Sequence, residues 1–427
     1  MKKRNLFFAL AAGMVMFSAC SNDDDVINGG NNGLNEEVQQ LVLQVASSGD
    51  GLQTRAGRPL LSEEAKQTIE NVKVIICDGS GAIKYVTNIE QWNTTGSTEY
   101  KTNGHGREKT IEIPKDKKLA AGKYTVYAFG YSTGSDYELT TITNATEGST
   151  FNANMTLAFK GDATNKIGEE IFAGDLELEV KKGEGFKTPV VLNRQVAGTF
   201  AYLKDIPYIA DASKLQLVAS NRNSQLVLGQ FGNFDLTGNG INNDNNINYV
   251  VNGTEAVQDK VIYTINLTDW FTQVKDDNND GLIDGDGNWI TANHTDYASG
   301  SVFGGSFLIP FKKDDNTETF KLKLTKANGI DVLREWVVKL PFDDKQLSEY
   351  TLWSWNSTFT DEQVTDKADK YSVVRNHLYG IGTRTLDKPT DPGTNPDIDE
   401  PESLNTKQEL TLRVNDNWEV IHNMEIE

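Results

Sequence analysis

Oxygen-bearing side chains are concentrated between residues 276 and 286, in an arrangement that could bind a metal ion. The candidate ligands are Asp276, Asn278, Asp280, Asp284 and Asp286. The first three stand at alternate positions before Gly281, as at the start of a calcium-binding loop. The bidentate glutamate expected at the twelfth position is absent, because Gly287 stands there. We therefore predict at most a structural calcium ion and no required cofactor; the alternative is an ordinary surface loop rich in Asn and Asp.

Histidine and cysteine, the other residue types that commonly do chemistry, form no local motif. The four histidines are far apart in the sequence, and the two cysteines are Cys20 and Cys77. Two cysteines exclude a disulfide framework and a cysteine-based zinc cluster. Cys77 ends an apolar run, so we expect a buried small side chain rather than a nucleophile. We predict no enzymatic activity; a surface hydrolase whose acidic residues meet only in space is the alternative.

The charge of the chain excludes one class of partner. The chain has 427 residues and a formal net charge of −20. Nucleic-acid binding requires clustered cations that neutralise phosphates, so we expect no nucleic-acid partner. An anionic membrane surface would also repel such a chain, so any membrane attachment must be covalent or hydrophobic.

The N-terminus is typical of an export signal. Basic residues at 2–4 precede an apolar run at 6–19, which is too short to span a bilayer because a span takes roughly 20 residues. The run ends in Ser18-Ala19-Cys20, which resembles a bacterial lipobox in which the cysteine carries the lipid. We predict a lipoprotein signal peptide over residues 1–20; a plain secretory signal with an incidental cysteine is the alternative.

The body of the chain is predicted to be all-β. Short runs rich in β-branched and aromatic residues recur between turn residues. Such runs occur at residues 72–76, 124–129, 261–265 and 320–324. Many short strands with polar loops favour two antiparallel β-sandwich domains in tandem. We place these domains at residues 56–186 and 187–385, because a charged, glycine-rich break lies at 181–185.

A third region follows the two predicted domains. Four of the ten prolines lie between residues 386 and 406, a density that excludes a central strand and predicts an exposed linker. Two alternating strands follow, and each places its apolar residues on one face. These residues are Leu410, Leu412, Val414, Trp418, Val420, Met424 and Ile426. Such a face must be buried, either in its own domain or in a neighbouring molecule. We interpret residues 386–427 as a linker and a donor strand.

A strand near the other end of the chain has the same apolar spacing. Leu41, Leu43 and Val45 repeat the Leu-x-Leu-x-Val pattern of residues 410–414. Two segments with the same spacing could fill the same groove at different times. We therefore predict that the strand carrying these three residues is removable.

The segment that follows this strand looks exposed and cleavable. Residues 47–57 are polar and glycine-containing, with Arg55 as a lone basic residue. Cleavage between Arg55 and Ala56 would detach residues 21–55, together with the lipid on Cys20. We predict that residues 21–55 are a propeptide.

These features together resemble a Bacteroidales type V pilin of the FimA/Mfa-like fimbrillin family over nearly the whole chain. Besides the lipobox, the family-like segments are Thr54-Arg55-Ala56, residues 120–129, 190–197 and 371–379, and the tryptophan-containing terminal strand. The resemblance implies two transthyretin-like β-sandwich domains. The long Asn- and Asp-rich loops are a departure that the family's assembly does not explain.

The resemblance also implies a route of assembly. Family members reach the outer membrane as lipoproteins, and an Arg-specific surface protease removes the N-terminal strand. The C-terminal strand of another copy, or of a related fimbrial subunit, then fills the opened groove. On this basis we expect a subunit of a cell-surface fimbrium in a shaft position, with a role in adhesion.

The alternative from another class is a surface glycan-binding lipoprotein built of β-sandwich modules. It would keep its lipid and remain uncut at Arg55. Trp353 and Trp355 would form an exposed aromatic platform, whereas an ordinary alternating strand would bury one of them. Arg194 and Arg375 are predicted to be structural partners of acidic or backbone groups.

Overall fold

The computed structural model confirms the prediction of an almost wholly β chain. The structure describes residues 38–46, 69–92, 98–99, 106–161, 168–219, 223–228, 249–250, 253–256, 260–294, 297–311, 320–339, 352–355, 361–364, 373, 375, 378–384, 399–405, 409–415 and 421–422. None of the helices in this part of the chain has the length and apolar character needed to span a membrane.

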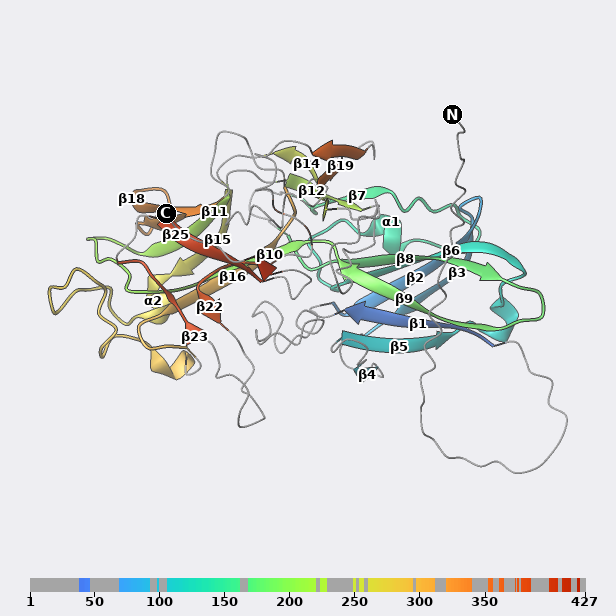
Figure 1. Cartoon of the computed structure of the whole chain (residues 1–427), viewed down its shortest axis with the longest axis horizontal. Coiled ribbons are helices and arrows are strands. Elements are labelled where there is room, and N and C mark those ends of the chain that lie inside the picture. The colour runs from blue at the N-terminus through green and yellow to red at the C-terminus, as the bar shows by residue number, and fades with distance from the viewer. Residues whose placement is uncertain are drawn as a thin grey trace, which may run out of the picture. The chain divides into compact units, whose positions relative to one another are not determined.

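The first sheet has eight strands in the order β3-β2-β6-β8-β9-β1-β5-β4. Their bounds are β1 Gln39–Ala46, β2 Asn71–Asp78, β3 Ile83–Ile89, β4 Thr98–Glu99, β5 Gly106–Glu112, β6 Gly122–Tyr131, β8 Phe172–Val180 and β9 Phe186–Arg194. β8 and β9 pair only where Phe172 faces Arg194 and Ala173 faces Asn193. The sheet turns over at this short pairing, and Figure 1 shows β2, β3, β6 and β8 in one layer, with β9, β1 and β5 in the other.

Apolar side chains from both layers meet between them, which makes this sheet a sandwich. β2 and β6 contribute Val72, Val74, Ile76, Val126 and Ala128, and β1 and β9 contribute Leu41, Leu43, Val190 and Leu192. On β1 and β9 these residues alternate with the more exposed Val42 and Val191. On β2 and β6 the intervening Ile75, Cys77 and Phe129 are buried in a second cluster. Strand β1 is therefore part of the core of the first sandwich.

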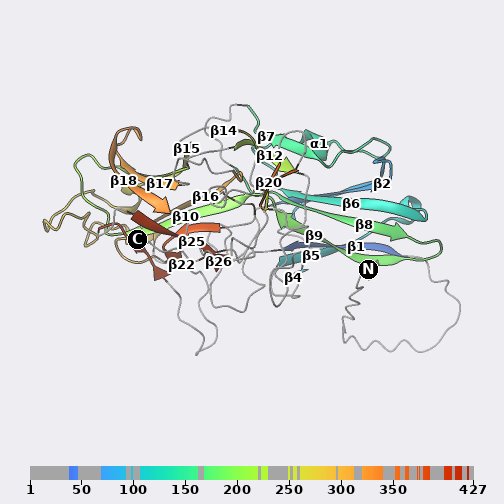
Figure 2. The same cartoon turned by 45° about the horizontal axis from the view of Figure 1, so that its top comes forward.

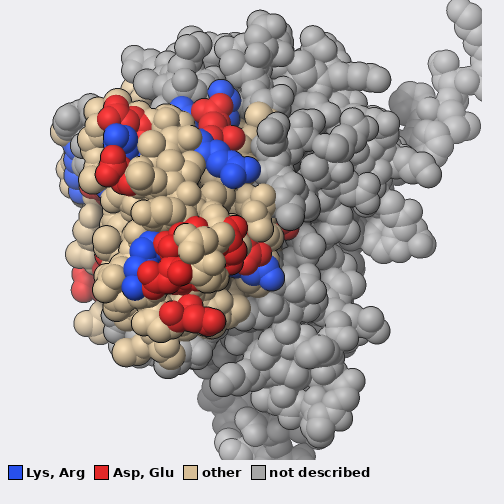
Figure 3. All heavy atoms as spheres, turned by 90° about the vertical axis from the view of Figure 1, so that its left-hand side faces the viewer, with Lys and Arg blue, Asp and Glu red and all other residues tan. Residues whose placement is uncertain are grey.

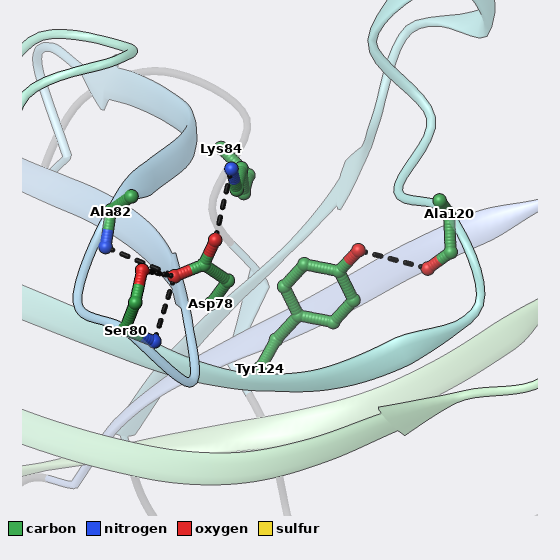
Figure 4. A network of polar contacts seen from close by, with 6 residues as sticks. All are labelled: Asp78, Ser80, Ala82, Lys84, Ala120 and Tyr124. Atoms are coloured by element: carbon green, nitrogen blue, oxygen red, sulfur yellow. Dashed lines mark hydrogen bonds and ion pairs between the residues drawn. The ribbon is translucent and has the colours of Figure 1, made fainter.

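A tight hairpin joins β2 and β3 at the Gly79-Ser80-Gly81 segment. The carboxylate of Asp78 accepts hydrogen bonds from the Ser80 hydroxyl at 2.6 Å and from the backbone N–H groups of Ser80 and Ala82 at 2.9 and 3.1 Å (Figure 4). Lys84 approaches the same carboxylate at 2.9 Å. Gly81 has a φ of 81°, which favours glycine at this turn position.

The second sheet has ten strands, eight of them in the order β15-β11-β17-β18-β25-β21-β10-β16. Their bounds are β10 Ala197–Lys204, β11 Lys214–Ala219, β15 Lys260–Asn266, β16 Val302–Leu308, β17 Phe320–Thr325, β18 Val332–Lys339, β21 Leu378–Ile381 and β25 Glu409–Asn415. The other two are β24 Glu402–Ser403, beside β10, and β26 Ile421–His422, beside β25. The core of this sheet includes the fully buried Phe320, Leu322 and Trp336.

The smaller elements complete the list. One three-stranded sheet comprises β7 Met155–Ala158, β12 Asn223–Leu228 and β14 Gly253–Ala256. Another comprises β13 Tyr249–Val250, β19 Leu352–Trp355 and β20 Asp361–Val364. A two-stranded sheet comprises β22 Thr383–Arg384 and β23 Asp399–Glu400. The helical segments in the described part of the chain are α1 Thr140–Thr143, α2 Leu267–Trp270 and two 3₁₀ turns, Lys115–Lys117 and Thr291–Asn293.

The joint predicted at residues 181–188 was placed too early. Residues 181–185 connect β8 to β9, and β9 belongs to the first sheet. The chain passes to the second sheet between Arg194 and Ala197, where β9 ends and β10 begins. A charged, glycine-rich segment suits a hairpin connection as well as a linker, so composition did not distinguish the two.

The two halves of the chain also share a core. β7 from the first half pairs with β12 from the second. Leu226, Leu228 and Ile309 lie in the same buried cluster as Phe129 and Tyr137. The division at 187 is therefore less complete than two independent sandwiches would require.

Part of the predicted exposed linker, residues 386–406, is docked against the protein. β24 runs parallel to β10, and the backbone N–H of Leu404 donates to the carbonyl of Lys204 at 3.0 Å. The Leu404 side chain is fully buried in the core of the second sheet. The high proline content pointed to an exposed linker, so the buried Leu404 at the end of the segment was not predicted.

Acidic and basic side chains are interspersed on the face of the molecule seen in Figure 3. On the second sheet, Glu335 lies between Lys321 and Lys323, at 3.1 and 3.7 Å. No extended basic area is visible among the described residues on this face.

Candidate functional site

Strand β1 fills a slot between β9 and β5. It runs parallel to β9, with Gln39–Val45 facing Phe186–Leu192, and antiparallel to β5, with Gln40–Ala46 facing Glu112–Gly106. Figure 1 shows β1, in dark blue, between these two strands. Because β1 pairs along nearly its whole length on both sides, its loss would separate β9 from β5.

The side chains of β1 confirm that its apolar face is buried. Leu41 and Leu43 are both 0% exposed, while Val42 between them is partly exposed. Leu43 lies opposite Val190 of β9, and Leu41 lies opposite Ile111 of β5. Burial of two leucines contributes roughly 3–6 kcal/mol of gross stabilisation. The backbone of Val45 lies in the same strand, opposite Leu192.

Gln39, at the start of β1, is a site residue that the sequence reasoning missed. Its side chain is 2% exposed and pairs with the backbone of Leu119 on both sides of the amide. Nε2 donates to the Leu119 carbonyl at 3.0 Å, and Oε1 accepts from the Leu119 N–H at 2.8 Å. The Gln39 carbonyl also accepts from the N–H of Ile113 at 2.9 Å. These bonds fix the end of the strand in the slot.

Close backbone packing at the same end depends on a glycine. A Cβ built on Gly185 would lie 2.3 Å from the carbonyl oxygen of Val38. A larger residue would therefore push the start of the strand away from β9. The N–H of Phe186 donates to that same carbonyl at 2.9 Å.

Strand β25 carries Leu410, Leu412 and Val414 and occupies a slot in its own second sheet. Glu409–Thr411 pair in parallel with Val337–Lys339 of β18, and Leu412–Asn415 pair antiparallel with Leu378–Ile381 of β21. Figure 2 shows β25 near β10 and β18. The alternating pattern left open whether this strand is buried in its own domain or in a neighbouring molecule. In the structure it lies in its own domain.

The two slots have the same arrangement but differ in how fully they pair the strand. Each holds a strand between one parallel and one antiparallel neighbour. β1 has both neighbours along nearly its whole length, whereas β25 has β18 along its first part and β21 along its second, with β26 added only at Val414 and Asn415. A strand with the sequence of β25 would therefore form more ladder hydrogen bonds in the slot of β1 than in its own.

A buried ion pair supports the point at which the chain leaves the first sheet. Arg194, at the end of β9, contacts Glu170 through Nη2 at 2.5 Å and donates through Nε at 2.7 Å, and both side chains are buried. Its guanidinium also lies 4.7 Å from the ring centre of Phe172. The prediction that Arg194 is a structural ion-pair partner is confirmed.

Arg375 ties the second half of the chain to the same point. Its Nη1 donates to Oε1 of Gln195 at 2.7 Å, and Gln195 Nε2 donates to the carbonyl of Asn193 at 2.8 Å. Both Arg375 and Gln195 are buried. Arg375 therefore has a structural role, as predicted, but this contact is with a side-chain amide and not with an acidic or backbone group. Two of the family-like segments meet here.

Several predicted site residues lie outside the described residues. These are Cys20, Arg55, Ala56, Trp418, Val420, Met424 and Ile426. Lipidation, cleavage and the outer part of the donor strand remain predictions.

The five predicted calcium ligands lie in an exposed loop between α2 and β16. Backbone N–H groups already occupy much of their oxygen capacity: Gly281 donates to Asp276 at 2.9 Å, and Leu282 donates to Asp280 at 2.8 Å. Asp284 accepts from the N–H of Asp277. Among the described residues, no three His, Cys, Asp or Glu side chains converge as a metal site would require. Calcium binding stays a prediction.

The thiol of Cys77 is the remaining candidate nucleophile, and its surroundings make it unreactive. Burial raises the pKa of the Cys77 thiol to about 11, and the side chain is 2% exposed. A thiol with a raised pKa is a poor nucleophile at neutral pH. This agrees with the expectation of a small hydrophobic side chain.

The fold defines an all-β protein whose first sandwich includes the N-terminal strand β1 of the same chain. The family model described as "Fimbrillin-A associated anchor proteins Mfa1 and Mfa2" matches residues 60–423. This match covers most of the chain, so the protein belongs to that family of Mfa-like fimbrillins. The resemblance stated from the sequence is thereby confirmed.

Solved structures with a similar fold include three fimbrial proteins. The anchor protein Mfa2 of Porphyromonas gingivalis is 10% identical, with a TM-score of 0.32 over 90% of this chain and 99% of that chain. The C-terminally truncated tip protein Mfa3 of the same organism is 12% identical, with a TM-score of 0.38 over 82% and 96%. A fimbrial assembly protein of Parabacteroides distasonis is 11% identical, with a TM-score of 0.32 over 82% and 92%. A search of curated proteins found no match.

Proposed function

We propose that this chain is a non-enzymatic structural subunit of a cell-surface fimbrium and that it assembles by strand exchange. In this scheme cleavage after Arg55 frees β1 from the rest of the chain. The C-terminal strand of a neighbouring copy, or of a related fimbrial subunit, then takes the place of β1 between β9 and β5. Adhesion would be a property of the assembled fibre.

The position of β1 is the observation that carries the proposal. It is an inner strand of the first sandwich, yet residues 47–68, which include Arg55, are its only covalent link to β2. Removal of an inner strand exposes two rows of backbone hydrogen-bonding groups and an apolar slot. Such an opening must be filled, and a strand from another molecule can fill it by β-augmentation.

The incomplete pairing of β25 supports its role as the replacement. Its own slot provides one neighbour along residues 409–413 and a second, β26, only at Val414 and Asn415, whereas the slot of β1 provides two along most of the strand. Each additional backbone hydrogen bond is worth about 0.5–1.5 kcal/mol net. Transfer of β25 would therefore recover part of the free energy needed to withdraw it from its own sheet.

The precursor is proposed to be an outer-membrane lipoprotein. A lipid on Cys20 would hold the precursor at the membrane, and an Arg-specific surface protease would release the mature subunit. While β1 is in place the slot is occupied, so uncut precursor cannot accept a donor strand. This exclusion would prevent assembly before export is complete.

A second candidate role within the same fibre is an end subunit that accepts a strand but does not donate one. The observation that favours it is β25 itself, which joins β18 to β21 in its own sheet. If β25 stays there, the cleaved chain cannot continue a shaft, and it would act as a tip. If β25 transfers, the shaft position predicted from the sequence applies.

Treatment of the purified precursor with an Arg-specific protease tests the proposal. We expect cleavage after Arg55, followed by SDS-resistant ladders and fibres visible by electron microscopy. An Arg55→Ala precursor should remain monomeric under the same treatment. Cleaved protein that stays monomeric for lack of a donor, but forms dimers with an added peptide of residues 405–427 fused to a carrier, would instead indicate the end subunit.

Deletion of residues 408–427 separates donor from acceptor. The truncated chain should form no polymers alone but should accept one strand from a full-length copy. Normal polymers from the truncated chain would contradict the proposal.

A further inference from the structure

Strand alternation alone does not distinguish two registers of β1 that differ by two residues. The contact between Gln39 and Leu119 does distinguish them. A slip of β1 by one residue would turn Leu41 and Leu43 to the solvent side and is excluded by their burial. A slip by two residues would keep apolar side chains inward. It would, however, remove the Gln39 amide from the buried N–H and carbonyl of Leu119, to which it bonds at 2.8 and 3.0 Å. Gln39 therefore fixes the register.

The same glutamine recurs at the same place before β25. Residues 39–45 read Gln-Gln-Leu-Val-Leu-Gln-Val, and residues 408–414 read Gln-Glu-Leu-Thr-Leu-Arg-Val. In both segments a glutamine stands two positions before the first leucine. The match extends the shared apolar spacing by a polar residue, which a generic amphipathic strand does not need.

Alignment of the two glutamines also predicts a favourable charge contact. Arg413 would take the position of Gln44, which lies opposite Glu108 of β5. Glu409 would take the position of Gln40, which lies between Glu112 of β5 and Lys187 of β9. The arginine gains an acidic neighbour, and the glutamate gains one neighbour of each sign.

We propose that the slot of β1 selects the C-terminal strand of a second copy in one register, in which Gln408 replaces Gln39 on the backbone of Leu119. This inference rests on the proposed strand exchange and adds to it a specificity-determining residue. Strands that lack a glutamine two positions before their first apolar residue would be poor donors. The backbone N–H and carbonyl of Leu119 then select the donor strand. Because they are backbone groups, this selection does not depend on the Leu119 side chain.

A disulfide scan tests the register. In the proposed register Thr411 takes the place of Val42, which lies opposite Thr110. Residues directly opposite on antiparallel strands have Cα atoms about 4.5–5.5 Å apart, a separation that suits a disulfide. Cleaved Thr110→Cys subunits are mixed with cleaved Thr411→Cys subunits under mild oxidation. We expect a linked pair, whereas Glu409→Cys and Arg413→Cys, each two residues away, should link poorly.

Substitution of Gln408 tests the glutamine itself. Gln408→Leu should lower donor affinity by roughly tenfold or more, because the Leu119 groups lose their partner. Glu409→Ala is the matched control and should have a much smaller effect. Unfolding of each uncut precursor checks that the variants fold. Gln39→Leu should destabilise the precursor but leave polymers of the cleaved protein unchanged, since β1 is absent from them.

The outcomes separate this inference from the function on which it rests. Failure of cleaved wild-type protein both to polymerise and to bind the carrier-fused peptide of residues 405–427 would overturn strand exchange as a whole. Normal polymers with preferential linking at Glu409→Cys or Arg413→Cys would overturn the register alone. Equal donor affinity of Gln408→Leu and wild type would overturn the role of Gln408.

Discussion

At the residue scale, the buried ion pair of Arg194 and Glu170 stabilises the fold around the slot of β1. Removal of one member of a buried pair leaves the other as an uncompensated charge, at a cost of about 3–5 kcal/mol. Arg194→Met should therefore lower the free energy of unfolding of the precursor by that amount, as measured by denaturant titration.

An exposed pair supplies the control for this prediction. Lys117 and Glu147 are 2.6 Å apart, but their side chains are 44% and 34% exposed. Glu147→Gln should cost at most about 1 kcal/mol. The double variant Arg194→Met, Glu170→Gln should lose less than the two single variants added together. Strict additivity would show that the two side chains do not act as a pair.

The Asp78 hairpin gives a prediction of pH dependence. Hydrogen bonds from the Ser80 side chain, the Lys84 ammonium and then backbone N–H groups lower the pKa of Asp78 below its ordinary value of 3.8. A lowered pKa in the folded state means that the stabilisation is present above pH 3.8 and is lost as the pH falls through the folded pKa. The stability difference between wild type and Asp78→Asn should therefore be constant near pH 7 and shrink below about pH 4. A difference that grows on acidification would contradict this assignment.

At the scale of elements, β1 should matter to the precursor and not to the fibre. Leu43→Ala should lower the free energy of unfolding of the precursor by about 2–5 kcal/mol, because it leaves a cavity in the first sandwich. Val42→Ala, on the partly exposed face, should cost much less. Fibres assembled after cleavage should have the same resistance to SDS in both variants and in wild type. A weaker fibre from Leu43→Ala would mean that β1 remains in it.

At the scale of the whole molecule, assembly brings together chains that repel one another. The precursor carries a net charge of −20, and salt screens such repulsion over a distance of about 8 Å at physiological ionic strength. Polymerisation of the cleaved protein should therefore be faster in 0.15 M salt than in 0.01 M salt, as followed by light scattering. A rate that falls with salt would indicate attraction between subunits as the main driving force.

Much of this organisation was predictable from local sequence patterns, because alternation reports directly on burial. The pattern Leu-x-Leu-x-Val identified β1, and the apolar runs at 72–76 and 124–129 identified β2 and β6. Contacts between distant segments were not predictable. The glycine-rich break at 181–185 connects β8 to β9 and does not join two domains, because the pairing of β9 with β1 and with β8 shows that β9 belongs to the first sheet. The bond of Gln39 to Leu119 has no local signature at all, since a buried glutamine looks like a surface residue in sequence.

The central claim is that β1 leaves and a neighbour's tail takes its place. The most direct test is the composition of purified fibres, measured by quantitative mass spectrometry of the fragment that contains residues 39–46. We predict that fibres formed after cleavage contain almost none of this fragment, while the unassembled cleaved protein retains it. Fibres that contain one copy of the fragment per subunit would contradict the account.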